Sequence, residues 1–336
     1  MSGKNQNGEI NLSKRQGRGC LIWLGRIIVS IIGLTLVGAM YESLAEAADA
    51  RTYPPPGQLV DVGGYRLHIN CTGTGDPTVI IDAGLGDWST MWAWVQPGAA
   101  KTTQVCTYDR AGSGWSEAGP LPRNAAQFAK ELHTLLQNAN IPGPYVLVGH
   151  SLGGLPMRVF TDMYPSEVAG VVLIESMSPR QFTQASMDAT SQLDSPSHAF
   201  TILPALGRIG LVRLLARPLG LIPHLPPEAE KAYLSRMVRP SYLQAYTDDG
   251  QGMPASGKQA AAVKTFGDIR LIVLTAKLDS SIPEWQAWQT ELLQLSSNSQ
   301  QLFAEKSGHN IEIEQPDAAV AAIVKMVELV RQSIQK

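Results

Sequence analysis

The fold is decided by one stretch, Tyr145-Val146-Leu147-Val148-Gly149-His150-Ser151-Leu152-Gly153-Gly154. Its first four residues are apolar and predict a buried strand, and a helical pattern begins at Leu152. Between them, Gly149 to Gly153 match the pattern G-x-S-x-G. A sharp turn of this kind projects its serine hydroxyl above a sheet, and the glycines are needed because the strained turn leaves no room for a Cβ. The stretch therefore predicts Ser151 as a nucleophile.

The segments on either side of this stretch alternate between strand and helix. After Pro54-Pro55-Pro56-Gly57, two short runs at 58–62 and 65–70 predict a β-hairpin around Gly63-Gly64. The pattern then predicts strands at 78–82, 103–108, 145–148, 170–174, 270–275 and 300–304, and helices at 123–141, 152–164, 283–295 and 316–334. This order predicts an α/β fold in which helices cover both faces of a mostly parallel, eight-stranded sheet.

One long segment interrupts the alternation. Residues from about 177 to 268 contain no clear strand but many apolar residues and prolines, as in Ile202-Leu203-Pro204. A loop of that length without structure of its own is uncommon inside a compact domain. The segment therefore predicts a helical cap inserted over a site.

A serine nucleophile needs a base, and His309 is the predicted one. It lies in Ser307-Gly308-His309-Asn310, after the last predicted strand and before the last helix, where a loop can direct an imidazole to the serine. The order nucleophile, acid, histidine is the one this kind of turn requires. The other histidines lie in the hairpin, on helices, in the cap or beside Ser151.

Two acidic residues are candidates for the carboxylate that orients the histidine. Asp279 follows the strand at 270–275, in a loop at the carboxyl edge of the sheet where sites of parallel sheets assemble. Glu175 comes directly after the strand that ends at Ile174 and reaches the same edge. We favour Asp279 and keep Glu175 as the alternative.

Two backbone amides are predicted to bind a developing oxyanion. One belongs to Leu152, at the start of the helix that follows Ser151. The other is expected in the loop Asp82-Ala83-Gly84-Leu85-Gly86-Asp87, whose glycines allow the amide of Leu85 to turn inwards. A plain glycine turn remains the alternative for this loop.

The N-terminal region has a different composition. Four basic residues, Lys4, Lys14, Arg15 and Arg18, precede an almost wholly apolar run from Cys20 to Met40. This run is long enough to span a bilayer, and the basic flank predicts a cytoplasmic N-terminus. We therefore expect a basic cytoplasmic tail (1–19), a membrane helix (20–40), a linker (41–57) and an extracytoplasmic domain (58–336). The alternative is a signal peptide cleaved after Ala45-Glu46-Ala47, which gives a secreted or periplasmic protein.

These motifs together resemble the α/β-hydrolase superfamily, and most closely its membrane-anchored bacterial branch of serine hydrolases and esterases. Besides Gly149 to Gly154, the run Tyr108-Asp109-Arg110-Ala111-Gly112-Ser113-Gly114-Trp115-Ser116 and the stretch Ser307-Gly308-His309 with Gln315-Pro316 are similar to segments of that family. The resemblance implies the strand order 1-2-4-3-5-6-7-8 and an acyl transfer without metal or cofactor. It departs from the family at Ala83-Gly84, where a His-Gly pair is common, and in the loop around Asp279.

The same resemblance makes the strands that carry Cys71 and Cys106 neighbours. An exported protein could oxidise this pair to a disulfide, and two buried free thiols are the alternative. Cys20 lies in the apolar run, so the three cysteines do not form a disulfide scaffold.

The function expected from these residues is the cleavage of carboxylic esters with small to medium apolar groups through an acyl-serine. Other reactions of the same triad, by amidases, peptidases, perhydrolases or C–C hydrolases, are alternatives on the same fold, as is a non-catalytic membrane-tethered binding protein. A net charge of -2 gives no bias towards nucleic acid. The expected partners are an apolar ester and the membrane.

Overall fold

Eight strands form one sheet in the order β1-β2-β4-β3-β5-β6-β7-β8. A computed structural model of the chain describes residues 7–182, 199–278 and 283–334. The strands are β1 (Gln58–Asp61), β2 (Arg66–Thr72), β3 (Val79–Asp82), β4 (Val105–Tyr108), β5 (Tyr145–His150), β6 (Val168–Ile174), β7 (Arg270–Ala276) and β8 (Ser299–Ala304). β2 pairs antiparallel with β1 and β4, and the other neighbours are parallel. The predicted fold class and strand order are confirmed.

Alternate side chains of the central strands face two separate hydrophobic cores. In β5, Val146 and Val148 pack on one face with α2 (Gln96–Ala99) and α12 (Pro316–Ile334). Tyr145 and Leu147 pack on the other face with α3 (Ala125–Asn138) and α4 (Gly154–Met163). Both faces of the sheet are therefore buried, as a parallel sheet requires.

Two of the helices that cover the sheet differ in their bounds from the prediction. The side chain of Asn124 accepts a hydrogen bond from the amide of Gln127 at 3.1 Å, so α3 begins at Ala125 rather than at residue 123. The helix expected at 283–295 is divided into α10 (Trp285–Glu291) and the 3-10 turn η5 (Leu292–Leu295). The remaining short elements are η1 (Ser89–Trp92), η2 (Ser151–Gly153), η3 (Pro165–Glu167), η4 (Pro179–Phe182) and α11 (Ile311–Glu314).

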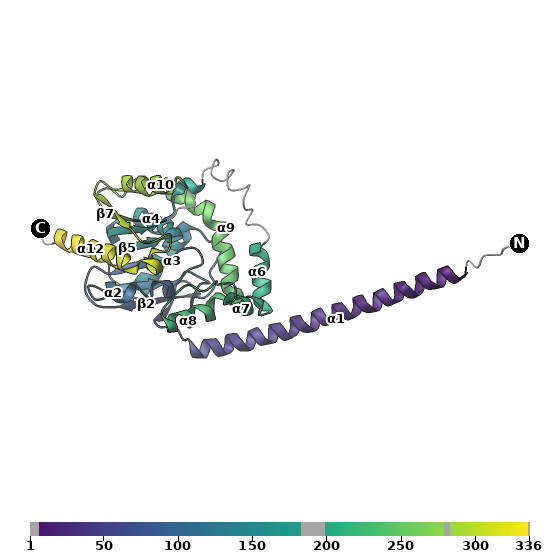
Figure 1. Cartoon of the computed structure of the whole chain (residues 1–336). Helices are drawn as coiled ribbons and strands as arrows, with labels where there is room; N and C mark the ends of the chain where they lie inside the picture. The colour runs from purple at the N-terminus through teal and green to yellow at the C-terminus, as the bar shows by residue number, and fades with distance from the viewer. Residues whose placement is uncertain (1–6, 183–198, 279–282, 335–336) are drawn as a thin grey trace.

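The segment between β6 and β7 is helical where it is described. It contains α6 (Ala199–Arg208), α7 (Leu211–Ala216), α8 (Pro227–Met237) and α9 (Pro240–Ala262), and the described residues of this segment contain no strand. These helices lie on one side of the sheet, between its body and the long N-terminal helix (Figure 1). They correspond to the predicted cap.

The N-terminal helix α1 (Asn7–Thr52) is continuous and projects away from the body of the protein (Figure 1). The stretch Ile22–Thr52 is long and apolar enough to cross a membrane, a test that a signal sequence also passes. Residues 41–52, expected as part of a linker, are helical instead. The reason is composition: residues 41–53 contain no Gly or Pro and include four Ala and two Glu, and the helix ends before Pro54-Pro55-Pro56.

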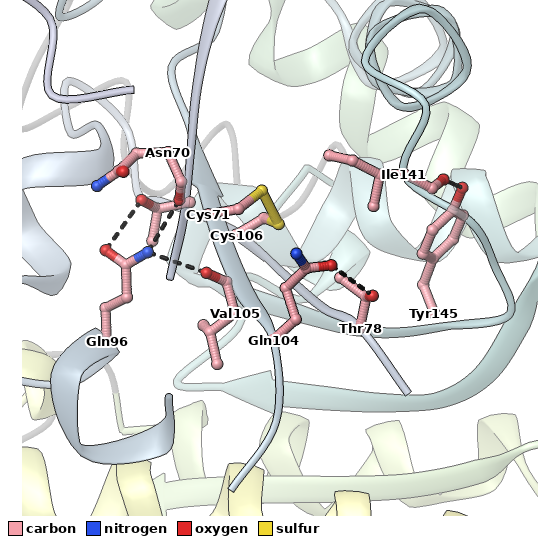
Figure 2. Close-up of a disulfide and its surroundings, with 10 residues drawn as sticks. Asn70, Cys71, Thr78, Gln96, Gln104, Val105, Cys106, Ile141 and Tyr145 are labelled. Atoms are coloured by element: carbon pink, nitrogen blue, oxygen red, sulfur yellow. Dashed lines mark hydrogen bonds between the residues drawn. A yellow bond between two sulfur atoms is a disulfide. The ribbon is translucent and has the colours of Figure 1, made fainter. Parts of the chain in front are cut away.

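A disulfide joins Cys71 of β2 to Cys106 of β4 (Figure 2). The two residues are register partners in the antiparallel pair, with their Cα atoms 4.0 Å apart. The side-chain amide of Gln96 donates to the carbonyl oxygens of Asn70 and Val105 at 2.9 and 3.0 Å, which ties α2 to the same two strands (Figure 2). Of the two states that the sequence allowed, the structure contains the oxidised one.

Candidate active site

Ser151 occupies a strained turn between β5 and α4. Its φ of 49° lies in the left-handed region that non-glycine residues rarely adopt. The glycines around it are required by space: a Cβ on Gly149 would lie 2.7 Å from the backbone of Gly154, and a Cβ on Gly153 would lie 2.7 Å from the carbonyl oxygen of Ala83. The turn therefore holds Ser151 in an unfavourable backbone conformation, which persists because the neighbouring residues are packed closely around it.

His309 meets this serine from the loop between β8 and α11. Its Nε2 atom lies 3.0 Å from Ser151 Oγ, and its side chain is 45% exposed. Two contacts fix the backbone of this loop: the amide of Gly308 donates to Glu314 at 2.7 Å, and the Nε2 of His150 lies 3.0 Å from the carbonyl oxygen of His309. The structure thus brings together the two residues that the sequence predicted as nucleophile and base.

Glu175 stands on the far side of the His309 ring. The residue follows β6 with a φ of 43°, and its side chain is buried. One carboxylate oxygen accepts from the amide of Ala276 and the other from the indole N–H of Trp285, both at 2.6 Å. The latter oxygen is also 3.5 Å from Nδ1 of His309. Two strong donors therefore hold this carboxylate against the histidine.

Asp279, the acid favoured from the sequence, lies outside the described residues. Its neighbour Leu278 donates its amide to the carbonyl oxygen of Ser307 at 3.0 Å. Leu278, the last described residue before Asp279, therefore lies beside the loop that carries His309. Among the described carboxylates, Glu175 is the one that faces the Nδ1 of His309.

The loop after β3 passes beside the nucleophile. A Cβ built on Gly84 would lie 3.5 Å from the Cβ of Ser151, so this backbone is as near to the serine as an oxyanion donor must be. Leu85 follows in the same loop, and Leu152 follows Ser151 in η2. The two amides predicted to bind an oxyanion therefore belong to segments that meet at Ser151.

A buried arginine holds the loop after β3 in place. Arg110 donates to the Asp82 carboxylate at 2.6 Å, to the carbonyl oxygen of Ala83 at 2.8 Å, and to that of Gly84. It also lies 3.4 Å from Asp249 of α9. Burial disfavours the charged form, but the two carboxylates raise the pKa of Arg110 above its usual value. A permanent cation thus links the loop beside Ser151 to the cap.

A second buried cluster lies directly behind the serine and histidine. Nδ1 of His150 is 3.5 Å from Glu312, and both side chains are almost fully buried. Asp87 approaches the same point, so that one nitrogen and two carboxyl groups lie within 4.8 Å of one another. Neither oxygen of Glu312 has a hydrogen-bond partner among the described residues. One imidazole and two carboxyl groups are also the composition of a cation site. Whether the cluster can bind a cation depends on the protonation states of these three groups.

Burial keeps His150 and Glu312 of this cluster neutral. It lowers the pKa of His150 to about 3, an effect that the nearby His309 reinforces. It raises the pKa of Glu312 well above its ordinary value, with a further increase from Asp87, and raises the pKa of Asp87 to about 6. Since a carbonyl oxygen only accepts, Nε2 of neutral His150 must donate to His309, and its Nδ1 is left as an acceptor that faces Glu312 at 3.5 Å. This arrangement suits a hydrogen-bonded support better than a metal site.

Comparison with known proteins identifies the family. A sequence profile of the alpha/beta hydrolase fold matches residues 77–316, which cover the described sheet from β3 to β8. The chain belongs to the alpha/beta hydrolase fold family. This membership supports a hydrolase in general.

Curated relatives of this hydrolase are distant. An AB hydrolase superfamily protein from Gibberella zeae is 26% identical over 285 residues, which are 76% of this chain and 87% of that protein. A probable transporter, efuK, from Hormonema carpetanum is 32% identical over 126 residues, but these are 35% of this chain and only 18% of the transporter. The similarity to the transporter is therefore confined to a part of each protein.

Solved structures with the same fold belong to several kinds of enzyme. The epoxide hydrolase CorEH has a TM-score of 0.64 at 18% identity, covering 82% of this chain and 99% of its own. A proposed lipase from Acinetobacter baumannii has a TM-score of 0.64 at 20% identity, covering 87% and 97%. Such similarity establishes the fold, and the reaction must be argued from the site.

Three residues around the site of this hydrolase had no role in the sequence reasoning. Arg110 carried a signal, since a charged pair directly after a buried strand is unusual, and it lies in the run that resembles the family. No sequence pattern indicated a role for Glu312 or Trp285. In Ile311-Glu312-Ile313-Glu314 only the tertiary structure buries the first glutamate and exposes part of the second.

Proposed function

We propose that this hydrolase cleaves carboxylic esters through an acyl-serine intermediate. The observation that carries the proposal is the 3.0 Å contact between Ser151 Oγ and His309 Nε2, made at a turn whose φ of 49° presents the serine. A nucleophile within hydrogen-bond reach of a histidine is the arrangement from which serine acyl transfer proceeds.

In this mechanism the hydroxyl of Ser151 donates to Nε2 of His309 and attacks the ester carbonyl. The imidazole takes the proton as the C–O bond forms, and then passes it to the leaving alcohol. Water repeats the sequence on the acyl-serine, releasing the acid and restoring the serine. The amides of Leu85 and Leu152 are proposed to stabilise the negative oxygen of both tetrahedral intermediates.

Glu175 is the carboxylate we propose to orient His309. Its distance of 3.5 Å to Nδ1 and its two strong donors support this role, since a fixed carboxylate keeps Nδ1 protonated and Nε2 free to accept. Asp279, which lies outside the described residues, is the competing candidate. Variants of these two residues separate them, as discussed below.

The proposed substrate is an ester with small to medium apolar groups, because the cap contributes apolar residues such as Tyr242 and Leu243 to the core above the sheet. We further propose that α1 anchors the enzyme in the inner membrane with residues 58–336 outside the cytoplasm. The Cys71–Cys106 disulfide supports this location, since disulfides persist in oxidising compartments. Cleavage after Ala47, with release from the membrane, is the competing outcome.

A fluorophosphonate probe tests the proposal, because it labels an activated serine covalently. We expect the wild type to be labelled and Ser151→Ala to remain unlabelled, with Ser113→Ala as a matched control that keeps the signal. A folded wild type that resists labelling would contradict the proposal and favour a binding protein. Hydrolysis of p-nitrophenyl esters of increasing acyl length, compared with the matching anilides, separates esterase from amidase activity.

A further inference from the structure

The exposed apolar side chains of the cap gather in one segment. Outside α1, nine large apolar side chains are exposed among the described residues, and five of them belong to the segment from Ile202 to Leu221. They are Ile202, Leu214, Leu215, Leu219 and Leu221, and we call them the cap leucine face although one is an isoleucine. A concentration of exposed large apolar side chains in one short segment marks it as a candidate interaction site.

This face is joined rigidly to α1. Arg213 of α7 donates to both oxygens of Glu42 at 2.9 and 2.8 Å and to Asp49 at 2.7 Å, and Glu42 is almost fully buried. The backbones also meet, because a Cβ on Gly38 would lie 2.4 Å from the carbonyl oxygen of Ile209. Removing one partner of a buried ion pair leaves an uncompensated charge, so these contacts hold α7 against α1.

The contact with α1 also fixes the level of the cap relative to the apolar run. The run ends at Met40, and an α-helix rises about 1.5 Å per residue, so Glu42 and Asp49 lie roughly 3 and 13 Å beyond it. Arg213 contacts both, and α7 therefore lies at the end of the stretch proposed to cross the membrane. That level corresponds to the lipid headgroups, since these add several ångströms beyond the hydrocarbon core.

The charges around the face fit the same surroundings. Arg208 and Arg217 are exposed at the two ends of the α7 region, next to the leucines in sequence, and Arg217 also pairs with Glu230 at 3.0 Å. Arginine side chains bury their stems along apolar surface and place their charge among headgroups, and anionic lipids attract them. Leucine and arginine together are the composition of segments that lie in a membrane interface.

We propose that the cap leucine face lies in the headgroup region of the membrane that α1 crosses. The inference rests on the proposed anchoring by α1 and is independent of the proposed reaction. Helix α1 then acts as a membrane anchor that also holds the cap of the hydrolase at the lipid surface.

A site-specific fluorescent label tests this placement in the full chain. In a Cys20→Ser background, with the other two cysteines held in the disulfide, Leu214→Cys and Leu219→Cys are labelled with an environment-sensitive dye. Glu328→Cys is the control, because Glu328 is exposed on α12, which lies on the side of the body away from α1 (Figure 1). The proteins are reconstituted in vesicles of phosphatidylethanolamine and phosphatidylglycerol, with or without lipids that carry a quencher near the headgroup.

We expect the labels at 214 and 219 to emit at shorter wavelength and to lose about half of their emission to the lipid quencher, as a depth of ~5–10 Å implies. The label at 328 should show neither effect. Labels at 214 and 219 that behave like the control would overturn the proposal. A shift to shorter wavelength without lipid quenching would also overturn it, because a protein would then cover the face.

Two further results keep this test separate from the proposed function. A mature chain that begins after Ala47 would overturn the placement, because Gly38 and Glu42 would be lost. The Ser151→Ala protein should give the same fluorescence as the wild type. The placement therefore stands or fails regardless of whether Ser151 reacts with the fluorophosphonate.

Discussion

Two histidine–carboxyl pairs meet behind and beside Ser151, and they have the same separation. Nδ1 of His309 is 3.5 Å from Glu175, and Nδ1 of His150 is 3.5 Å from Glu312. The carboxylate of Glu175 accepts two strong hydrogen bonds from other groups, whereas Glu312 has no hydrogen-bond partner among the described residues. The ring of His309 is half exposed, and that of His150 is buried.

The difference shows that the surroundings of a pair, and not its separation, decide its chemistry. The two donors hold the Glu175 carboxylate facing Nδ1 of His309, where it can support a histidine that gains a proton. Burial without donors keeps His150 and Glu312 neutral, as the lowered pKa of His150 and the raised pKa of Glu312 indicate. The first pair is suited to proton transfer, and the second is suited to holding the loop of His309.

The largest expected effect separates the two histidines. His309→Ala should lower kcat by on the order of 10⁶-fold, because nucleophile and base act as one unit. His150→Gln should cost far less, because its side-chain amide can still donate towards the carbonyl oxygen of His309. Steady-state hydrolysis of a p-nitrophenyl ester measures both. Similar losses in the two variants would show that His150 takes part in proton transfer.

The next effect concerns Glu175, the carboxylate of the His309 pair. Glu175→Gln should lower kcat by about 10⁴-fold, since the histidine would lose the partner that fixes its tautomer. Asp279→Asn is the matched control and should remain near wild-type rates. The kinetic constants of both variants are measured with one ester. The opposite ranking would assign the orienting role to Asp279, as the sequence alone suggested.

A smaller effect is expected from the pair of His150 and Glu312, and it concerns stability. Glu312→Gln replaces a neutral acid with a neutral amide, so activity near neutral pH should stay close to that of the wild type. The free energy of unfolding, measured with urea and tryptophan fluorescence, should depend differently on pH. A large loss of activity at neutral pH would show that Glu312 is ionised in the folded enzyme.

The sign of this pH dependence follows from the two shifts. Glu312 has a folded pKa above its ordinary 4.5, so it contributes stability that is lost as pH rises above that value. His150 has a folded pKa of about 3, below its ordinary 6.5, so its contribution is lost as pH falls below 6.5. The two oppose each other between these values. His150 contributes equally to variant and wild type, so relative to the wild type Glu312→Gln should gain up to about 1.4 kcal/mol of unfolding free energy per pH unit above pH 4.5.

The smallest effect on activity is expected at the disulfide, which contacts neither pair. Cys71→Ala with Cys106→Ala opens a link across 35 residues and should lower the free energy of unfolding by about 3–4 kcal/mol. Esterase rates of the folded variant should be unchanged. Urea titration and the ester assay measure the two quantities. A parallel loss of activity would show that the strands carrying the disulfide help to position the site.

The sequence predicted the sheet because local patterns determine strands and helices one at a time. The run 145–154 placed Ser151 between a strand and a helix, and the strand order 1-2-4-3-5-6-7-8, implied by the family resemblance, is the one observed. Residues 41–52 were expected as a linker, since the apolar pattern stops at Met40. The polar sequence that follows is nonetheless rich in helix formers, and the helix continues.

The sequence by itself determined the strands, the turn at Ser151 and the candidate status of His309, because each depends on neighbouring residues. Only the tertiary structure decided which glutamate faces His309, which is buried behind His150, and how Arg110 and Arg213 tie the cap to the sheet and to α1. The physical reason is that the protonation state and the contacts of a side chain depend on its burial and on the groups that lie beside it. Both arise from residues that lie more than a hundred positions apart in the chain.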